Sequence, residues 1–93
     1  MLVRAFVVEG LVQGVGFRWF TREQARRHGL RGWVRNEADG RVRAVAAGPA
    51  ASLDAFEARL REGPAGSRVD AVIVEPAGPV LIDDLPQPFS VLR

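Results

Sequence analysis

The sequence predicts one α+β domain, spanning residues 1–93, with the element order β-α-β-β-α-β. Its 93 residues are the length of a single domain, and 47% of them are hydrophobic, which is enough for one modest core. Segments rich in β-branched and aromatic residues alternate with two segments whose apolar residues recur at helical spacing. This order is the plan of a ferredoxin-like sandwich, in which two helices cover one face of an antiparallel sheet.

Three strands and one helix are expected in the first half of the chain, over residues 3–8, 17–28, 32–35 and 41–46. Gly10 closes the first strand, and Gly29 follows the helix where a C-terminal cap is typical. Asp39 and Gly40 are a strong turn signal between the second and third strands, which therefore form a hairpin.

The second half predicts a helix, a strand, an irregular connection and a short last strand, over residues 49–62, 69–75, 76–88 and 89–92. Pro49 and Gly63 mark the two ends of the helix, and its buried side carries Leu53, Phe56 and Leu60. The connection holds four of the six prolines, so it is expected to be irregular. It also contains apolar residues that must cover something, namely Val80, Leu81 and Ile82.

Composition excludes several kinds of site. The absence of cysteine excludes a disulfide framework, a thiolate metal site and a cysteine nucleophile, and the single His argues against a His-rich metal cluster. We therefore expect no metal and no cofactor. No apolar run could span a membrane, and Arg4 interrupts the apolar start that a signal peptide would need. We expect a cytoplasmic monomer that binds neither membranes nor nucleic acid.

Positive charge is concentrated in one part of the chain. Residues 17–43 hold eight of the 13 basic residues, all of them Arg, against three acidic residues. This half is therefore expected to attract anions. We expect a solvated face formed by Arg22, Arg26, Arg27 and Arg31, and a packing or rim position for Trp19.

The loop between the first strand and the first helix is the segment that predicts chemistry. Gly14 and Gly16 permit conformations in which successive backbone N–H groups point into one concavity, and the following helix adds its own unpaired N–H groups. Arg18 lies in the first helical turn, where its charge opposes the helix dipole unless an anion is bound. The loop lacks the Gly-Lys-Ser/Thr ending of a nucleotide-binding P-loop. It is interpreted as a phosphate cradle, with a tight turn and a solvated Arg18 as the alternative.

The run Gly10–Arg18, followed by Gly32–Asn36 and Asp39-Gly40, resembles the acylphosphatase family. The similarity continues through Gly63-Pro64 and Ser67–Val69, so it covers nearly the whole chain. The resemblance implies a ferredoxin-like hydrolase that converts acyl phosphates to a carboxylate and inorganic phosphate, without metal or cofactor. Inorganic phosphate is then expected as product and competitive inhibitor.

The resemblance places the two catalytic positions on Arg18 and Asn36. It places the substrate phosphate-binding loop on Gln13, Gly14, Val15, Gly16, Phe17 and Arg18. The planar fork of Arg18 would clamp two phosphate oxygens, and Asn36, the only Asn in the chain, would position the attacking water. Because the leaving carboxylate is already stable as an anion, no general acid is needed. Glu37 stands where some family members carry a hydroxyl residue, and this departure puts only the fine tuning of the activity in doubt.

Alternative interpretations stay open. Asn36 could simply end a strand before a turn. The same element order occurs in RNA-recognition modules, whose phosphate contacts the basic half could make, although the glycine-aromatic run here falls on a loop rather than on a central strand. A non-catalytic, regulatory domain of acylphosphatase type would carry the same sequence features.

Overall fold

The computed structural model describes residues 1–93 as a five-stranded sheet with two α-helices and one short 3-10 helix. The elements are β1 (Leu2–Leu11), α1 (Phe17–Arg27), β2 (Arg31–Asn36), β3 (Val42–Gly48), α2 (Ala50–Glu62), β4 (Arg68–Pro76), η1 (Ile82–Asp84) and β5 (Ser90–Val91). The strand order across the sheet is β4-β1-β3-β2-β5. The predicted element order and ferredoxin-like fold are confirmed.

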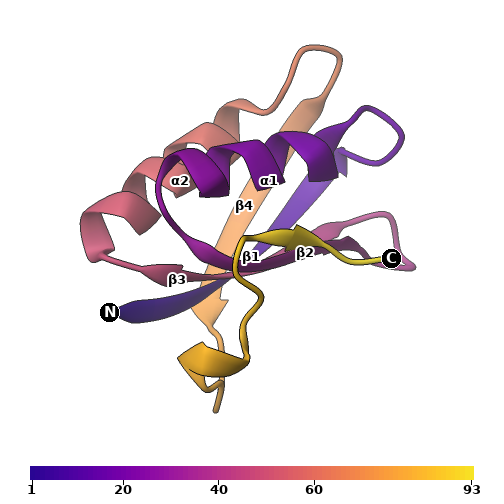
Figure 1. Ribbon diagram of the computed structural model, residues 1–93. Helices are drawn as coiled ribbons and strands as arrows, with labels where there is room; N and C mark the ends of the chain where they lie inside the picture. The colour runs from indigo at the N-terminus through magenta and orange to yellow at the C-terminus, as the bar shows by residue number, and fades with distance from the viewer.

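Both α-helices lie on the same face of the sheet, as Figure 1 shows. The apolar stripe of α2 packs there as predicted, with Leu53, Phe56 and Leu60 all buried. The Phe56 ring meets the Phe6 ring edge-on, with centroids 5.3 Å apart, and lies 6.1 Å from the Phe89 ring. One core between helices and sheet thus joins β1, α2 and the residue that precedes β5.

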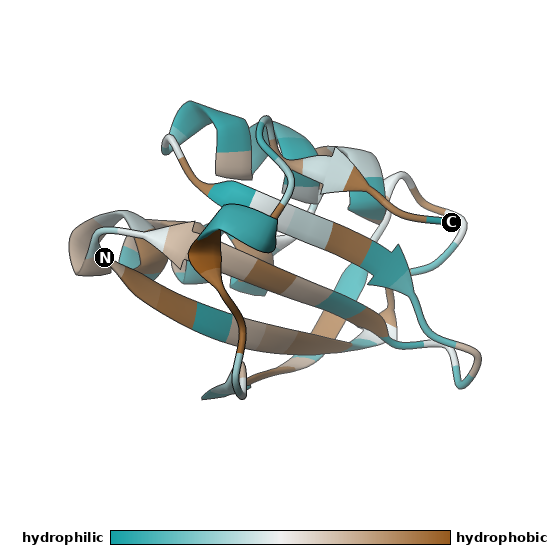
Figure 2. Cartoon of the chain, turned by 60° about the horizontal axis from the view of Figure 1, so that its bottom comes forward, coloured by the Kyte–Doolittle hydropathy of each residue, from teal (hydrophilic) through white to brown (hydrophobic).

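The opposite face of the sheet is covered by the proline-rich segment between β4 and β5, which crosses it in Figure 2. Val80 and Ile82 pack there against a small cluster of buried residues, Ala5, Val45, Ala47 and Leu85. The guanidinium of Arg31 fixes the segment by donating hydrogen bonds of 3.2 and 2.7 Å to the Leu85 carbonyl oxygen. The expectation that Leu81 also covers apolar surface is wrong, because its side chain is 71% exposed.

Gly10 does not close β1, as the sequence suggested, but forms a bulge inside it. The register with β4 shifts between Glu9 and Gly10, and the strand continues to Leu11. A side chain at Gly10 would place its Cβ 2.1 Å from the carbonyl oxygen of Arg68. The glycine therefore permits a close approach of two strands rather than ending one.

The last strand makes the sheet mixed. β1, β2, β3 and β4 pair antiparallel, whereas β5 runs parallel to β2, with Ser90 beside Trp33 and Val91 beside Val34. This pairing carries the C-terminal residues toward the end of β2 and the start of α1, where Figure 1 places the C-terminus.

Candidate active site

The loop between β1 and α1 forms a cup of backbone N–H groups. Gly14 and Gly16 adopt left-handed conformations, with φ of 77° and 76°, and Gly16 is the N-terminal cap of α1. The N–H groups of residues 14–16 donate to no backbone acceptor, and the first bond of α1 is donated by Phe20 to the Gly16 carbonyl. The N–H groups of residues 17–19 therefore lack intrahelical acceptors. No side chain caps this helix end, so the cup is suited to an anion.

Arg18 lies in the first turn of α1 and adds the cation of the cup. No acidic residue occupies that turn. One terminal nitrogen of Arg18 donates a weak hydrogen bond of 3.4 Å to the Leu92 carbonyl oxygen, which steers the guanidinium toward the end of β5. A positive charge at a helix N-terminus is electrostatically unfavourable until an anion binds there.

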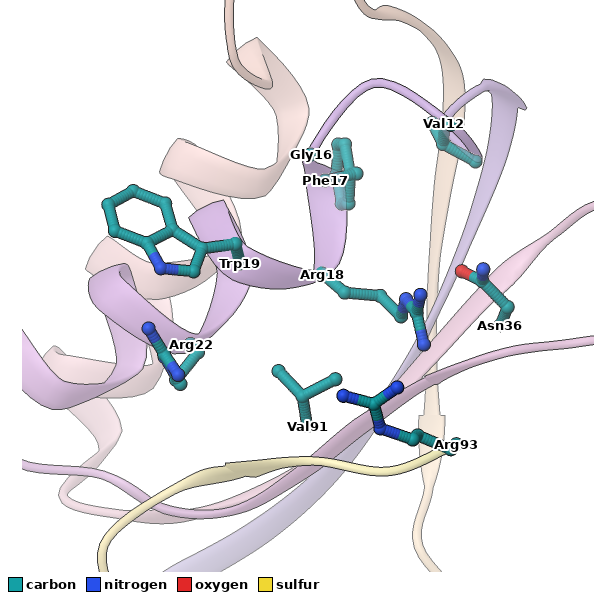
Figure 3. Close-up of a pocket in the computed structure, with 10 residues that line it drawn as sticks. Val12, Gly16, Phe17, Arg18, Trp19, Arg22, Asn36, Val91 and Arg93 are labelled. Carbon is teal, nitrogen blue, oxygen red and sulfur yellow. The ribbon is translucent and has the colours of Figure 1, made fainter.

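Asn36 is the last residue of β2 and contributes a polar acceptor. Its side-chain oxygen Oδ1 is buried and has no hydrogen-bond partner. A buried acceptor without a partner is uncommon in folded proteins, because it has lost water without gaining a donor. Figure 3 shows Asn36 and Arg18 together at one pocket. Two sequence-predicted residues that lie 18 positions apart are thus brought to the same place.

The pocket has a volume of about 310 Å³. It is lined by Val12, Gly14, Gly16, Phe17, Arg18, Trp19, Arg22, Asn36, Val91 and Arg93. Three of these residues are arginines and none is acidic. Arg22 was expected on a solvated face but lines the pocket, while Trp19 takes the predicted rim position with 60% of its surface exposed.

Sequence reasoning missed Val91 and Arg93 as pocket residues. They reach the pocket only because β5 pairs with β2, a contact that spans more than 50 positions. Arg22 could have been found, since it lies four residues after Arg18 and therefore on the same side of α1.

Gln13 and Val15 belong to the predicted phosphate-binding loop but do not line the pocket. Val15 packs against the core beneath the loop. The Gln13 amide instead donates hydrogen bonds to the hairpin between β2 and β3, at 2.8 Å to the Glu37 carbonyl and 3.0 Å to the Arg41 carbonyl. The loop that forms the cup is thereby fastened to the hairpin that begins directly after Asn36.

An ion pair stiffens the same hairpin. Asp39 accepts hydrogen bonds from the backbone N–H of Arg41 at 3.1 Å and from its Nε at 2.8 Å. The Arg41 guanidinium and N–H lower the pKa of the Asp39 carboxyl, and the carboxylate in turn raises the pKa of Arg41. The pair is exposed, so it fixes the local turn more than it stabilises the fold.

Comparison with known proteins matches residues 4–82 to the acylphosphatase family model. The chain belongs to the acylphosphatase family. It is 54% identical over 76 residues to an acylphosphatase of Koribacter versatilis, covering 82% of this chain and 69% of that protein. It is 48% identical over 84 residues to an acylphosphatase of Rhizobium etli, covering 90% and 86% of the two chains.

The solved structures agree with the sequence relatives. The crystal structure of acylphosphatase from Bacillus subtilis superposes with a TM-score of 0.90 at 35% identity, covering all of both chains. As a member of this family, the chain is an enzyme that hydrolyses acyl phosphates. No group of three or more His, Cys, Asp or Glu side chains is arranged to hold a metal ion. Neither α-helix has the length and apolar composition of a membrane span.

Proposed function

We propose that Arg18 and the N–H groups of the loop bind the phosphoryl group of the substrate, and that Asn36 positions the water that attacks it. The observation that carries this proposal is the buried, unpartnered Oδ1 of Asn36 in the same pocket as Arg18. An amide oxygen can accept one hydrogen of a water molecule, which leaves a water lone pair free to point at phosphorus.

The electrostatics of the pocket support phosphate as the bound group. The backbone N–H groups of residues 14–19 donate to no backbone acceptor, so those that face the pocket are free to bind phosphoryl oxygens, and no carboxylate lines the pocket to repel them. Arg18 can add two parallel hydrogen bonds from its planar guanidinium. These contacts match the charge that collects on the equatorial oxygens in the loose transition state of phosphoryl transfer.

Hydrolysis proceeds by direct attack of water in this proposal. The water oxygen bonds to phosphorus while the bond between phosphorus and the acyl oxygen breaks, and the carboxylate departs with the electron pair. The proton of the water goes to the phosphate product or to solvent. Because the leaving carboxylate has a low pKa, the site needs no acid on that side. In this proposal Arg18 and the backbone N–H groups stabilise the charge, and water itself is the nucleophile.

Isotope labelling tests this route. Hydrolysis of benzoyl phosphate in water enriched in oxygen-18 is expected to place the label in inorganic phosphate and none in benzoate. Rapid-quench kinetics should show benzoate and inorganic phosphate forming together, because no phosphorylated enzyme accumulates. Label in benzoate would mean attack at the carbonyl carbon, and a burst of benzoate without an equal burst of phosphate would mean a phosphorylated enzyme; either result contradicts direct attack of water on phosphorus.

A monomeric state, a cytoplasmic location and competitive inhibition by inorganic phosphate stay predictions from the sequence. Inhibition is expected because the cup that holds the substrate phosphoryl group would also hold the product. Gel filtration, cell fractionation and steady-state kinetics with added phosphate test the three in turn.

A further inference from the structure

Beyond the phosphate cup, the pocket is also lined by Trp19 and Arg22 of α1 and by Val91 of β5, and we call this part of it the extension. In Figure 3, Asn36 lies on one side of the Arg18 guanidinium, and Trp19 and Arg22 lie on the other. Arg22 and Arg93 are the further cations of the pocket. If Arg18 and the loop hold the phosphoryl group, Arg22 is free to bind another group of the substrate.

The geometry of in-line attack assigns this extension to the acyl group. In-line displacement places the attacking water and the leaving oxygen on opposite sides of phosphorus. Because Asn36 holds the water in the proposed function, on which this inference rests, the acyl group must point away from Asn36. That direction leads to Trp19, Arg22 and Val91 (Figure 3).

Arg22 is prepared to receive an anion. Its Nε is buried and has no hydrogen-bond partner, although Nε–H is a donor. Its guanidinium carbon lies 5.6 Å from the centre of the Trp19 ring, which restricts the side chain. Its only acidic contact is with Glu23 at 3.4 Å, where the two side chains are 29% and 34% exposed. The pair is partly exposed and its contact is long, so a carboxylate of the substrate can replace it.

We propose that Trp19, Arg22 and Val91 form an acyl subsite that favours acyl phosphates with a second negative charge on the acyl group. Val91 supplies the apolar floor, the Trp19 ring supplies a wall, and Arg22 binds the distal anion through its planar edge. Neutral acyl groups also fit this subsite, but they leave the Nε–H of Arg22 without an acceptor.

Two matched substrates test the subsite. The ratio of kcat/KM for 4-carboxybenzoyl phosphate over 4-methylbenzoyl phosphate isolates the effect of the distal charge, and the para position prevents attack of that carboxylate on its own acyl carbon. We expect Arg22→Gln to lower this ratio about five- to tenfold, as for a partly exposed charge-assisted hydrogen bond. Arg27→Gln removes the same charge from an exposed position of α1 outside the pocket, so it should leave the ratio within about twofold. Thermal melts establish that each variant is folded.

Several outcomes would overturn the assignment. The ratio could stay at the wild-type value in Arg22→Gln, both substrates could lose activity equally, or Arg93→Gln could lower the ratio in place of Arg22→Gln. Asn36→Ala, measured on the neutral substrate, tests the proposed function separately. If Asn36→Ala is slow but Arg22→Gln keeps the wild-type ratio, the subsite alone is contradicted. If Asn36→Ala keeps full turnover, Asn36 does not hold the water, and the argument for the position of the subsite fails with it.

Discussion

The side-chain amide of Gln13 donates a hydrogen bond of 2.8 Å to the backbone carbonyl oxygen of Glu37. This bond joins the two halves of the proposed site, since Gln13 begins the cup and Glu37 directly follows Asn36. A second hydrogen bond, of 3.0 Å to the Arg41 carbonyl, joins the same amide to the other arm of the hairpin. The relative position of phosphate and water therefore depends on Gln13, a residue that does not line the pocket.

Gln13→Ala should lower activity through misplacement. Losing two partly buried hydrogen bonds is expected to cost about 1–3 kcal/mol of unfolding free energy. The loosened hairpin should also lower kcat about ten- to a hundredfold, because small displacements of reacting groups are costly. Urea unfolding and kcat on benzoyl phosphate, well below the melting temperature, measure the two effects. Gln87→Ala, at an exposed position outside this site, is the control. A destabilised Gln13→Ala enzyme with full kcat would show that Gln13 contributes to stability but does not position the site.

The Asp39–Arg41 pair predicts a small pH-dependent contribution to stability. The pKa of Asp39 is lowered from 3.8, so the folded state favours the charged carboxylate. The stabilisation is therefore present above pH 3.8 and is lost as the pH falls through the lowered value. Asp39→Asn keeps an oxygen for the Arg41 N–H but loses the charge, so it should lower the melting temperature slightly at pH 7 and progressively less below pH 3.8. If the melting temperatures of the two proteins differed as much well below pH 3.8 as at pH 7, an electrostatic origin would be contradicted.

Arg18→Lys should lose most activity although the charge is kept. An ammonium group cannot reproduce the two parallel bonds of a guanidinium, so a loss of about a hundredfold in kcat/KM is expected. Inhibition by inorganic phosphate should weaken as well. Arg27→Lys, on an exposed part of α1, is the matched control and should behave like wild type. Near-normal turnover in Arg18→Lys would remove Arg18 from the mechanism.

Chelation should leave the rate unchanged, because the proposed charge stabilisation comes from Arg18 and backbone N–H groups. Turnover of benzoyl phosphate before and after exhaustive dialysis against a chelator measures this. Loss of turnover that magnesium restores would show that a metal ion carries part of that stabilisation.

Local pattern predicted the elements and the cup, since helix periodicity, turn residues and paired glycines act over a few positions. Gly10 was misinterpreted because its role comes from β4, whose Arg68 carbonyl approaches it from far along the chain. Likewise, no local signal places Val91 and Arg93 beside Arg18, because the parallel pairing of β5 with β2 brings them there. Asn36 itself was predicted as a site residue, but the burial of its Oδ1 without a hydrogen-bond partner results from tertiary packing, which the local sequence does not reveal.

The Asn36→Ala variant tests the division between binding and chemistry most directly. Removing the acceptor Oδ1 takes away a contact that matters as water attacks, whereas Arg18 and the loop N–H groups still bind phosphate. We predict that kcat on benzoyl phosphate falls about a hundred- to a thousandfold. The inhibition constant of inorganic phosphate should stay within about threefold of wild type, since phosphate binding does not require the water. With the fold verified by circular dichroism, retained turnover, or a proportional loss of turnover and phosphate affinity, would contradict the role given to Asn36.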